Sequence, residues 1–226
     1  MAEDRKLTAL VFGGTGLTGK FLTELLIADD RYYKIILYVR REVPSYHGKV
    51  KQIIFDAERI SEIKNEITGD HLFCCIGTTI KKAGSKEAFL NTDHHLIVNI
   101  AKAAVSNGIQ VFSFISSIGA NPASSNFYLN TKGITEDVLK NLGFNQLNIL
   151  RPSMLLGLRN ESRPLEEFGK TLFKIFSFLL IGRMKKYSPV HALTVAKAMI
   201  TAANDMQGTH VIESDKIEEL GNTQQQ

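Results

Sequence analysis

The chain has few cysteines, and the two that it has cannot pair with each other in the ordinary way. Cys74 and Cys75 are adjacent and lie in an apolar run. Neighbouring side chains of a strand point to opposite faces, so these thiols cannot form an ordinary structural disulfide. The sequence also has no charged-then-apolar leader. We therefore expect an unsecreted protein of a reducing compartment, with a cytoplasmic location.

Long apolar runs and dense charge are also missing. A membrane-spanning helix needs roughly 20 apolar residues, and the nearest approach, IFSFLLI at 175–181, is much shorter. We expect no transmembrane segment. The 27 Lys and Arg residues against 23 Asp and Glu give a net charge of +4, and the basic residues are scattered. This charge is too weak for a nucleic-acid surface, although a basic edge can receive a phosphorylated ligand.

What the sequence does contain is a regular alternation of short apolar runs with amphipathic segments. Continuous apolar strands that alternate with helices are typical of a parallel sheet covered on both faces. We therefore predict an α/β fold, a doubly wound parallel sheet of the Rossmann type. The predicted strands span 7–12, 34–39, 50–55, 71–76, 110–115, 146–150 and 209–212, and predicted helices span 17–28, 86–106 and 127–141.

After residue 150 the alternation of strands and helices gives way to a helix-rich segment. Helices are predicted at 165–181 and 190–204. Because ligands bind outside the carboxyl ends of the strands, residues about 151–208 are expected to form most of a small C-terminal helical lobe on the substrate side. Three interpretations of the 165–181 helix stay open: a lid over the cleft, a dimer face, and a helix at a membrane surface. Its apolar residues occupy nearly every side of the helix, which favours burial of the whole helix.

A glycine-rich turn, VFGGTGLTG at 11–19, joins the first predicted strand to the first predicted helix. Glycines there permit a sharp reversal, a close approach of the main chain to a pyrophosphate, and tight packing of helix on strand. The phosphates then meet the free N–H groups and the positive end of the helix dipole. The turn predicts a dinucleotide site with cofactor contacts from Gly13, Thr15, Gly16, Leu17, Thr18 and Gly19. The whole chain, 1–226, is then a single NAD(P)-binding Rossmann domain.

The end of the second predicted strand decides between two cofactors. An acid at this place binds the ribose 2′-hydroxyl of NAD, whereas an arginine accommodates the 2′-phosphate of NADP. The chain has YVRR here and no acid, so Arg40, with Arg41 behind it, favours NADP(H) over NAD(H). The alternative is a pair of solvated arginines at a strand end.

Further cofactor contacts are expected where other strands end. Asp56 can accept a hydrogen bond from the adenine amino group, and Gly77 lets the chain pass close to the cofactor. Pro152, after the sixth strand, can place backbone groups near the nicotinamide amide. Cys75 can line the cleft, although a buried strand thiol is usually inert.

A catalytic pattern lies in FISSIGANPASSNFYLNTKG at 114–133. Tyr128 and Lys132 are four residues apart, so on a helix both project from one face. A nearby cation favours the phenolate and makes the tyrosine a usable acid or base. Ser116 and Ser117 leave the fifth strand at its carboxyl end, where a hydroxyl can hydrogen-bond a substrate carbonyl. The pattern indicates hydride transfer.

Together, the glycine turn, the serine pair and the Tyr128/Lys132 pair resemble an atypical short-chain dehydrogenase/reductase. FCCIGTTIKKAG, SSNFYLNTKG and ESRPLEE resemble more narrowly the Tat-interacting-protein-like oxidoreductase group, over roughly residues 8–213. The resemblance implies a Rossmann fold, NADPH binding and a Ser/Tyr/Lys centre. It implies that Ser117, rather than its neighbour Ser116, is the catalytic serine. It also implies that Asn91 is the helix asparagine that braces the active site.

The sequence therefore predicts an NADPH-dependent oxidoreductase that reduces a small carbonyl substrate. In it Tyr128 donates the proton, Lys132 tunes Tyr128 and holds the cofactor ribose, and both residues contact the cofactor. Ser116, Arg159 and Arg163 are candidate substrate contacts, with salt bridges to nearby glutamates as the alternative for the two arginines. Two rival functions stay open: an NADPH-binding redox sensor or regulatory interaction protein with little turnover, and an epimerase or dehydratase that uses NAD transiently. Arg40 in place of an acid argues against the second. No metal site is predicted, and the protein is expected to be a monomer or a homodimer, with peripheral membrane contact left open.

Overall fold

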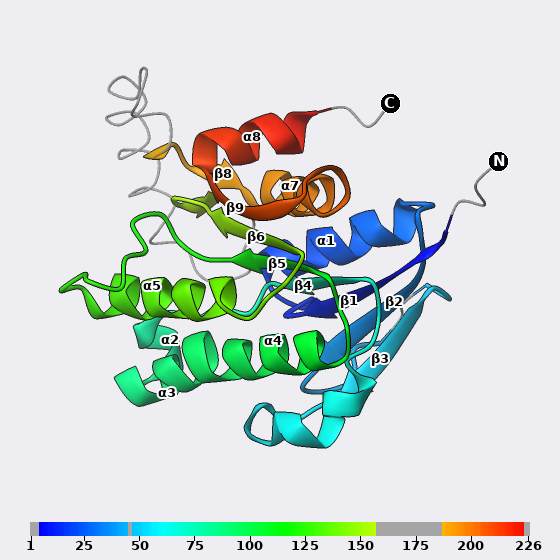
Figure 1. Ribbon diagram of the computed structural model, residues 1–226, viewed down its shortest axis with the longest axis horizontal. Helices are drawn as coiled ribbons and strands as arrows, with labels where there is room; N and C mark the ends of the chain where they lie inside the picture. Colours follow the sequence, from blue (N-terminus) through cyan, green and yellow to red (C-terminus); the bar gives the residue numbers. More distant parts are fainter. Residues whose placement is uncertain (1–4, 45–46, 157–186, 224–226) are drawn as a thin grey trace.

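A computed structural model describes residues 5–44, 47–156 and 187–223. Its central feature is a sheet of seven strands in the order β3-β2-β1-β4-β5-β6-β9, with every neighbouring pair parallel (Figure 1). This order confirms the predicted doubly wound α/β fold. The strands are β1 (Leu7–Phe12), β2 (Tyr32–Val39), β3 (Val50–Ile54), β4 (His71–Cys74), β5 (Val111–Ile115), β6 (Gln146–Arg151) and β9 (Gly208–Glu213).

Helices cover both faces of this sheet (Figure 1). Successive side chains of β1 enter opposite cores: Ala9 belongs to one, and Leu10 to the other. This alternation with burial on both sides explains why the strand reads as a continuous apolar run. The helices are α1 (Leu17–Ala28), α2 (Ile80–Ala83), α3 (Lys86–Leu90), α4 (Ile97–Ser106), α5 (Phe127–Lys140), α7 (Ala192–Asp205) and α8 (Ser214–Asn222), with a 3-10 helix η1 (Ala57–Glu66) and a π-helix η2 (Asn91–Leu96).

The helix bounds differ from the sequence pattern in several places. The predicted helix 86–106 consists of α3, the π-helical turn η2 and α4. The predicted helix 190–204 begins two residues later, after the short strand β8 (Val190–His191), which pairs with β7 (Leu155–Leu156). Neither η1 nor α8 was predicted, because each is short and exposes most of its residues.

The later part of the chain is only partly described. Residues 157–186, which include the predicted 165–181 helix, lie outside the described residues. Helix α7 packs beside α1 on the sheet and contributes Val195 and Met199 to its core. None of the helices in the described part of the chain has the length and apolar character that crossing a bilayer requires.

The sheet order creates a switch point between β1 and β4. From β1 the chain runs outward through β2 and β3, and then returns to pair β4 with the other side of β1. In open α/β sheets, ligands bind in the crevice outside the carboxyl ends of the strands at such a point. The loops after Phe12 and Cys74 are therefore where a ligand is expected.

Candidate cofactor and active site

The loop after β1 is held against the end of β4 so closely that only glycine fits. Gly13 has φ +77, and a Cβ there would lie 2.7 Å from the carbonyl carbon of Cys75. The amide of Gly16 donates to the Gly13 carbonyl at 2.9 Å and closes the turn. Both the left-handed backbone and the contact with β4 therefore require glycine at position 13.

The remaining glycines of the turn have separate roles. A Cβ on Gly19 would lie 2.2 Å from the Gly13 carbonyl oxygen, so this glycine lets α1 begin directly against the turn. A Cβ on Gly14 would lie 2.1 Å from Cδ1 of Leu37 on β2. Gly16 is exposed and caps the start of α1 without a side-chain hydrogen bond.

The start of α1 has the properties of an anion site. The first turn of α1 carries no acidic residue, and its N-terminal N–H groups point out of the helix. The hydroxyl of Thr18 is buried and has no hydrogen-bond partner, while Thr15 is exposed and Leu17 half-buried. Phosphate oxygens would satisfy such donors. The turn therefore fits the pyrophosphate of a dinucleotide.

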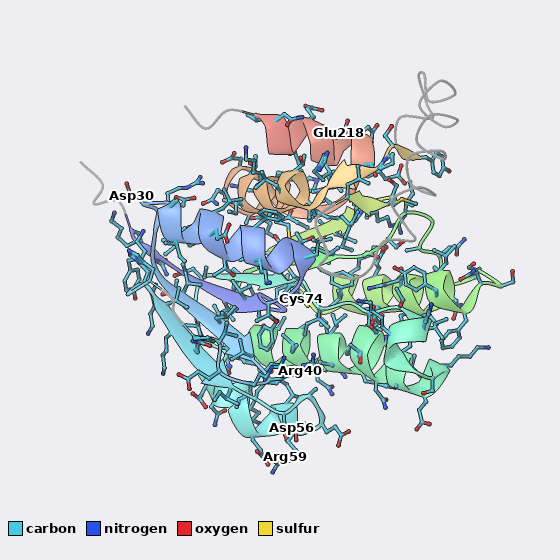
Figure 2. The ribbon with its side chains drawn as sticks, turned by 180° about the vertical axis from the view of Figure 1, so that it is seen from behind. Asp30, Arg40, Asp56, Arg59, Cys74 and Glu218 are labelled. Carbon is cyan, nitrogen blue, oxygen red and sulfur yellow. The ribbon has the colours of Figure 1, made fainter. Side chains whose placement is uncertain are left out.

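Two arginines lie at the end of β2, next to the end of β3. Arg40 and Arg41 are exposed, and no hydrogen bond or ion pair joins either to another described residue. Val39 pairs with Ile54, so Arg40 and Asp56 follow neighbouring strand ends, and Figure 2 labels Arg40, Asp56 and Arg59 in the same region. A planar guanidinium at this edge can bind a phosphate.

Asp56 has a local role that the sequence did not indicate. Its Oδ1 accepts from the Glu58 amide at 3.0 Å and so caps η1, and its Oδ2 lies 3.4 Å from Nε of Arg59. The amide of Glu58, followed by the neighbouring Arg59, holds the pKa of Asp56 below its usual value. The carboxylate is exposed, so it can still accept a further hydrogen bond from an adenine amino group.

At the carboxyl end of β4, Lys132 reaches from α5 to a buried carboxylate. Its Nζ lies 2.7 Å from Oδ1 of Asp93, and the two side chains are 3% and 0% exposed. The other carboxylate oxygen accepts from the Thr78 amide at 2.9 Å. A Cβ on Gly77 would lie 3.6 Å from Asp93 Oδ1 and 3.7 Å from Lys132 Nζ, so Gly77 borders the ion pair.

The π-helical turn decides which residue faces Lys132. Asn91 is exposed at the end of α3, while Asp93, two residues later, points inward. Asp93, and not the predicted Asn91, is thus the residue of this turn that pairs with Lys132. A π-turn changes the helix register by about one residue, and nothing in the apolar pattern of 86–106 indicates it. The one signal that the sequence offered was an acidic residue within a segment whose apolar residues have helical spacing.

Tyr128 lies one helical turn before Lys132, near the start of α5. Asn126 caps this helix by accepting from the Leu129 amide at 3.2 Å. The Tyr128 ring is half-buried and lies 5.5 Å from the ring of Phe89. No described residue bonds its hydroxyl, which leaves the phenol available to a ligand. Tyr128 and Lys132 thus lie one turn apart on α5, as their spacing predicted, and the pairing of their side chains stays a prediction.

The two adjacent serines differ in what they contact. Ser116 is buried and donates to Oε1 of Glu136 at 2.5 Å. Glu136 also accepts from Nε of Arg151 at 2.9 Å, so the Ser116 hydroxyl belongs to a buried network and not to an open surface. Ser117 is half-buried, and the only described hydrogen bond of its hydroxyl is a 3.3 Å contact to the Ile118 carbonyl.

The remaining candidate residues contact the protein interior or lie outside the described residues. The carbonyl of the buried Pro152 accepts from the Ile118 amide at 3.0 Å and so ties the serine loop to β6. Cys75 Sγ lies 3.9 Å from Sδ of Met199, and burial raises the pKa of this thiol well above its usual value. Such a thiol is a poor nucleophile. Arg159 and Arg163 lie outside the described residues.

Comparison with known proteins places this site in a family. A family model described as NAD(P)H-binding matches residues 13–172, from the first glycine of the turn through α5 and β6. The chain belongs to the NAD(P)H-binding family. The matched region contains the glycine turn, both strand-end arginines and the Tyr128/Lys132 pair.

The chain is also similar in sequence to individual curated proteins. The chain is 32% identical over 207 residues to Protein HTATIP2 of Rattus norvegicus. The alignment covers 88% of this chain and 84% of that protein. The chain is 34% identical over 202 residues to Protein FMP52, mitochondrial, of Candida glabrata, with 88% and 85% covered. The first relationship confirms the resemblance to the Tat-interacting-protein-like group.

Solved structures share the NAD(P)H-binding fold. The Bordetella bronchiseptica enzyme WbmH in complex with NAD+ superposes with a TM-score of 0.69 at 19% identity, over 96% of this chain and 79% of that one. A short chain dehydrogenase family protein from Francisella tularensis gives a TM-score of 0.65 at 17% identity, over 93% and 98%. At such identities the likeness shows the fold alone.

Proposed function

We propose that this protein is an NADPH-dependent oxidoreductase of the short-chain dehydrogenase/reductase type, which reduces a small carbonyl substrate. One observation carries the proposal: Tyr128, whose hydroxyl no described residue bonds, lies one helical turn before Lys132 on α5. Lys132 borders Gly77 after β4, at the switch point where a ligand is expected.

The proposed roles follow from the position of each group. Tyr128 donates a proton to the carbonyl oxygen, and the Lys132 ammonium favours the phenolate that remains. Ser117, whose hydroxyl has only a weak partner, orients the carbonyl by a hydrogen bond. A nicotinamide dinucleotide held at this site would supply the hydride for the carbonyl carbon, and with the proton from Tyr128 the carbonyl would become an alcohol.

The preference for NADP(H) is part of the proposal. Arg40 and Arg41 are exposed at the end of β2, and neither has a described partner that would occupy its guanidinium. An arginine at this place accommodates the 2′-phosphate, whereas NAD binding would favour an acid. We propose as cofactor contacts Gly13, Thr15, Gly16, Leu17, Thr18, Gly19, Arg40, Arg41, Asp56, Gly77, Tyr128 and Lys132.

The test is calorimetric titration with NADPH and NADH side by side, followed by a panel of small aldehydes and ketones read at the NADPH absorbance band. We expect tighter binding of NADPH and turnover of at least one carbonyl. Binding without turnover would overturn the reductase assignment and leave the cofactor site. Absence of binding to either dinucleotide would overturn both.

A second candidate function, an NADPH-binding sensor with little turnover, is favoured by one observation. The Lys132 ammonium is already paired with Asp93, which weakens its field at Tyr128. In a sensor, NADPH would change the protein's shape or partners without being consumed. Limited proteolysis with and without NADPH would distinguish the two, because only a sensor requires a change in protection on binding.

We further propose a cytoplasmic location for a monomer or homodimer. Cys74 and Cys75 are both free thiols, which fits a reducing compartment. The relatives called FMP52 are described as mitochondrial in their names. Fractionation of cells, followed by detection of the protein in the cytosol or in mitochondria, decides between these locations, and sedimentation of the purified chain gives its assembly.

A further inference from the structure

The buried pair of Asp93 and Lys132 joins three parts of the fold. Asp93 comes from η2, Lys132 from α5, and the Thr78 amide that binds the second carboxylate oxygen from the loop after β4. The loop after β4 is also where Gly13 approaches the Cys75 carbonyl. The carboxylate therefore holds the ammonium at the same edge of the sheet as the glycine turn.

The main chain around Asp93 is also held in place. The hydroxyl of Thr135, on α5, lies 3.1 Å from the Asp93 carbonyl oxygen. The same hydroxyl lies 2.9 Å from Nδ1 of His94. These contacts join η2 to α5 beside the ion pair.

The other titratable groups near Lys132 do not replace the charge of Asp93. Cys74 on β4 lies close enough to feel both charges, but burial raises its pKa to about 12, so it is neutral at ordinary pH. Glu136, one turn further along α5, is bound to Ser116 and Arg151. Burial, together with the neighbouring His95 and Lys102, lowers the pKa of His94.

An uncompensated ammonium in this place would lose its proton readily. Burial in a low dielectric disfavours the charged form, whereas an opposite charge within about 4–6 Å favours it by roughly 1–3 pH units. Asp93 lies at 2.7 Å. The carboxylate thus supplies an opposite charge to a lysine with 3% of its side chain exposed.

We propose that Asp93 is a positioning residue for the active site. It fixes the Lys132 ammonium at the carboxyl end of β4, where Lys132 can contact the cofactor. The proposal rests on the proposed function for the role of Lys132 toward the cofactor. The charge effect itself needs neither cofactor nor substrate.

Three variants and one control isolate this effect. Asp93→Asn removes the charge at nearly constant volume, Lys132→Met removes the cation, and a double variant removes both. Asp137→Asn is the matched control, because Asp137 lies on the exposed side of α5, the helix that carries Lys132, and pairs with Lys140. Its variant should behave as wild type.

The first readout is the unfolding constant of each variant in urea between pH 7 and 10. In Asp93→Asn, the folded state releases the Lys132 proton more readily than the unfolded state, so stability rises with pH. We expect the ratio of unfolding constants, Asp93→Asn over wild type, to fall by about tenfold or more over this range. In the double variant, measured against Lys132→Met, the ratio should not change. A ratio independent of pH in Asp93→Asn would overturn the proposal.

A reciprocal measurement covers the case in which Asp93→Asn does not fold. Lys132→Met leaves Asp93 as an unpaired buried carboxylate, whose folded state takes up a proton more readily than the unfolded state. Its stability relative to wild type should therefore rise as pH falls from 7 to 5. No such rise, in a variant that folds, would mean that the two charges do not compensate each other, and the proposal fails.

The second readout is NADPH affinity across the same alkaline range, which a purely structural role would not change. We expect the affinity of Asp93→Asn to decline at a pH roughly 1–3 units below that of wild type and of Asp137→Asn. Coincident curves would overturn the positioning role. Failure of wild type to reduce any carbonyl would defeat the proposed function, while both readouts on Asp93 would still be measurable.

Discussion

The Ser116 hydroxyl lies 2.5 Å from Oε1 of Glu136, and both side chains are buried. Arg151 binds the same carboxylate through Nε at 2.9 Å. The hydroxyl therefore completes a buried charged network that joins β5, α5 and β6. Its neighbour Ser117 carries no comparable bond, so two adjacent serines have different tasks.

This difference predicts opposite phenotypes for two alanine variants. Ser116→Ala leaves a buried carboxylate with one donor fewer, and we expect the free energy of unfolding to fall by about 1–3 kcal/mol. Ser117→Ala should change stability by less than about 0.5 kcal/mol but reduce turnover of the carbonyl substrate strongly. Urea unfolding and steady-state rates on both proteins test this. An unstable Ser117→Ala beside a wild-type-like Ser116→Ala would reverse the assignment.

Gly13→Ala should abolish dinucleotide binding and destabilise the fold. The substitution strains a backbone with φ +77 and places a Cβ 2.7 Å from the Cys75 main chain. Gly143→Ala is the control: Gly143 also has a positive φ, +85, but nothing lies within 4 Å of its added Cβ. The control should lose only about 1 kcal/mol of stability and keep its NADPH affinity. Equal losses in both variants would mean that the contact with β4 is unimportant.

Arg40→Asp should shift cofactor preference from NADPH toward NADH. The variant loses a guanidinium for the 2′-phosphate and gains a carboxylate that can bind a ribose hydroxyl. We expect NADPH affinity to fall by roughly 10-fold or more, which is about the value of one charge-assisted hydrogen bond. Calorimetric titration with both dinucleotides measures it, with Arg59→Ala as a control at the same edge. An unchanged ratio of affinities would remove Arg40 from the 2′-phosphate site.

Tyr128→Phe should abolish turnover and leave NADPH binding nearly intact. Only the hydroxyl is removed, and the ring contact with Phe89 at 5.5 Å stays. The melting temperature should therefore stay close to that of wild type. Single-turnover absorbance measurements with saturating NADPH check the prediction. Retained reduction at the wild-type rate would exclude Tyr128 as the proton donor.

Because the His71 imidazole is buried, we expect the protein to lose stability in acid. Its Nδ1 lies 2.8 Å from the Tyr32 hydroxyl, and burial lowers its pKa from 6.5 to about 4. The unfolded chain therefore binds the proton first. The stability contributed by neutral His71 is fully present above pH 6.5 and is lost as pH falls toward 4, by up to about 3 kcal/mol.

Comparing variants with wild type separates the effect of His71 protonation on stability from the effect of carboxylate protonation. His71→Gln should flatten the pH dependence of urea unfolding between pH 6.5 and 4, whatever it does to stability at neutral pH. His95→Gln is the control, since His95 is exposed. If both variants keep the full wild-type slope, the acid sensitivity arises elsewhere.

Much of the fold could be predicted because its signals are local. A strand buried on both faces reads as an apolar run, and seven such runs identified the seven strands of the main sheet. Helix α1 begins and ends where its apolar period predicted. The short elements β7, β8, η1 and α8 were missed, because a few partly exposed residues carry too little periodic signal.

The sequence by itself determined the parallel sheet, the glycine turn and the Tyr128/Lys132 spacing, since each depends on residues close together in the chain. Only the tertiary structure decided what those side chains contact. The π-turn directs Asp93 rather than Asn91 toward Lys132, and Glu136 engages Ser116 and leaves Ser117 free of it. Both outcomes depend on groups that come from different elements, and an ion pair or hydrogen bond between such groups is set by packing that no local pattern encodes.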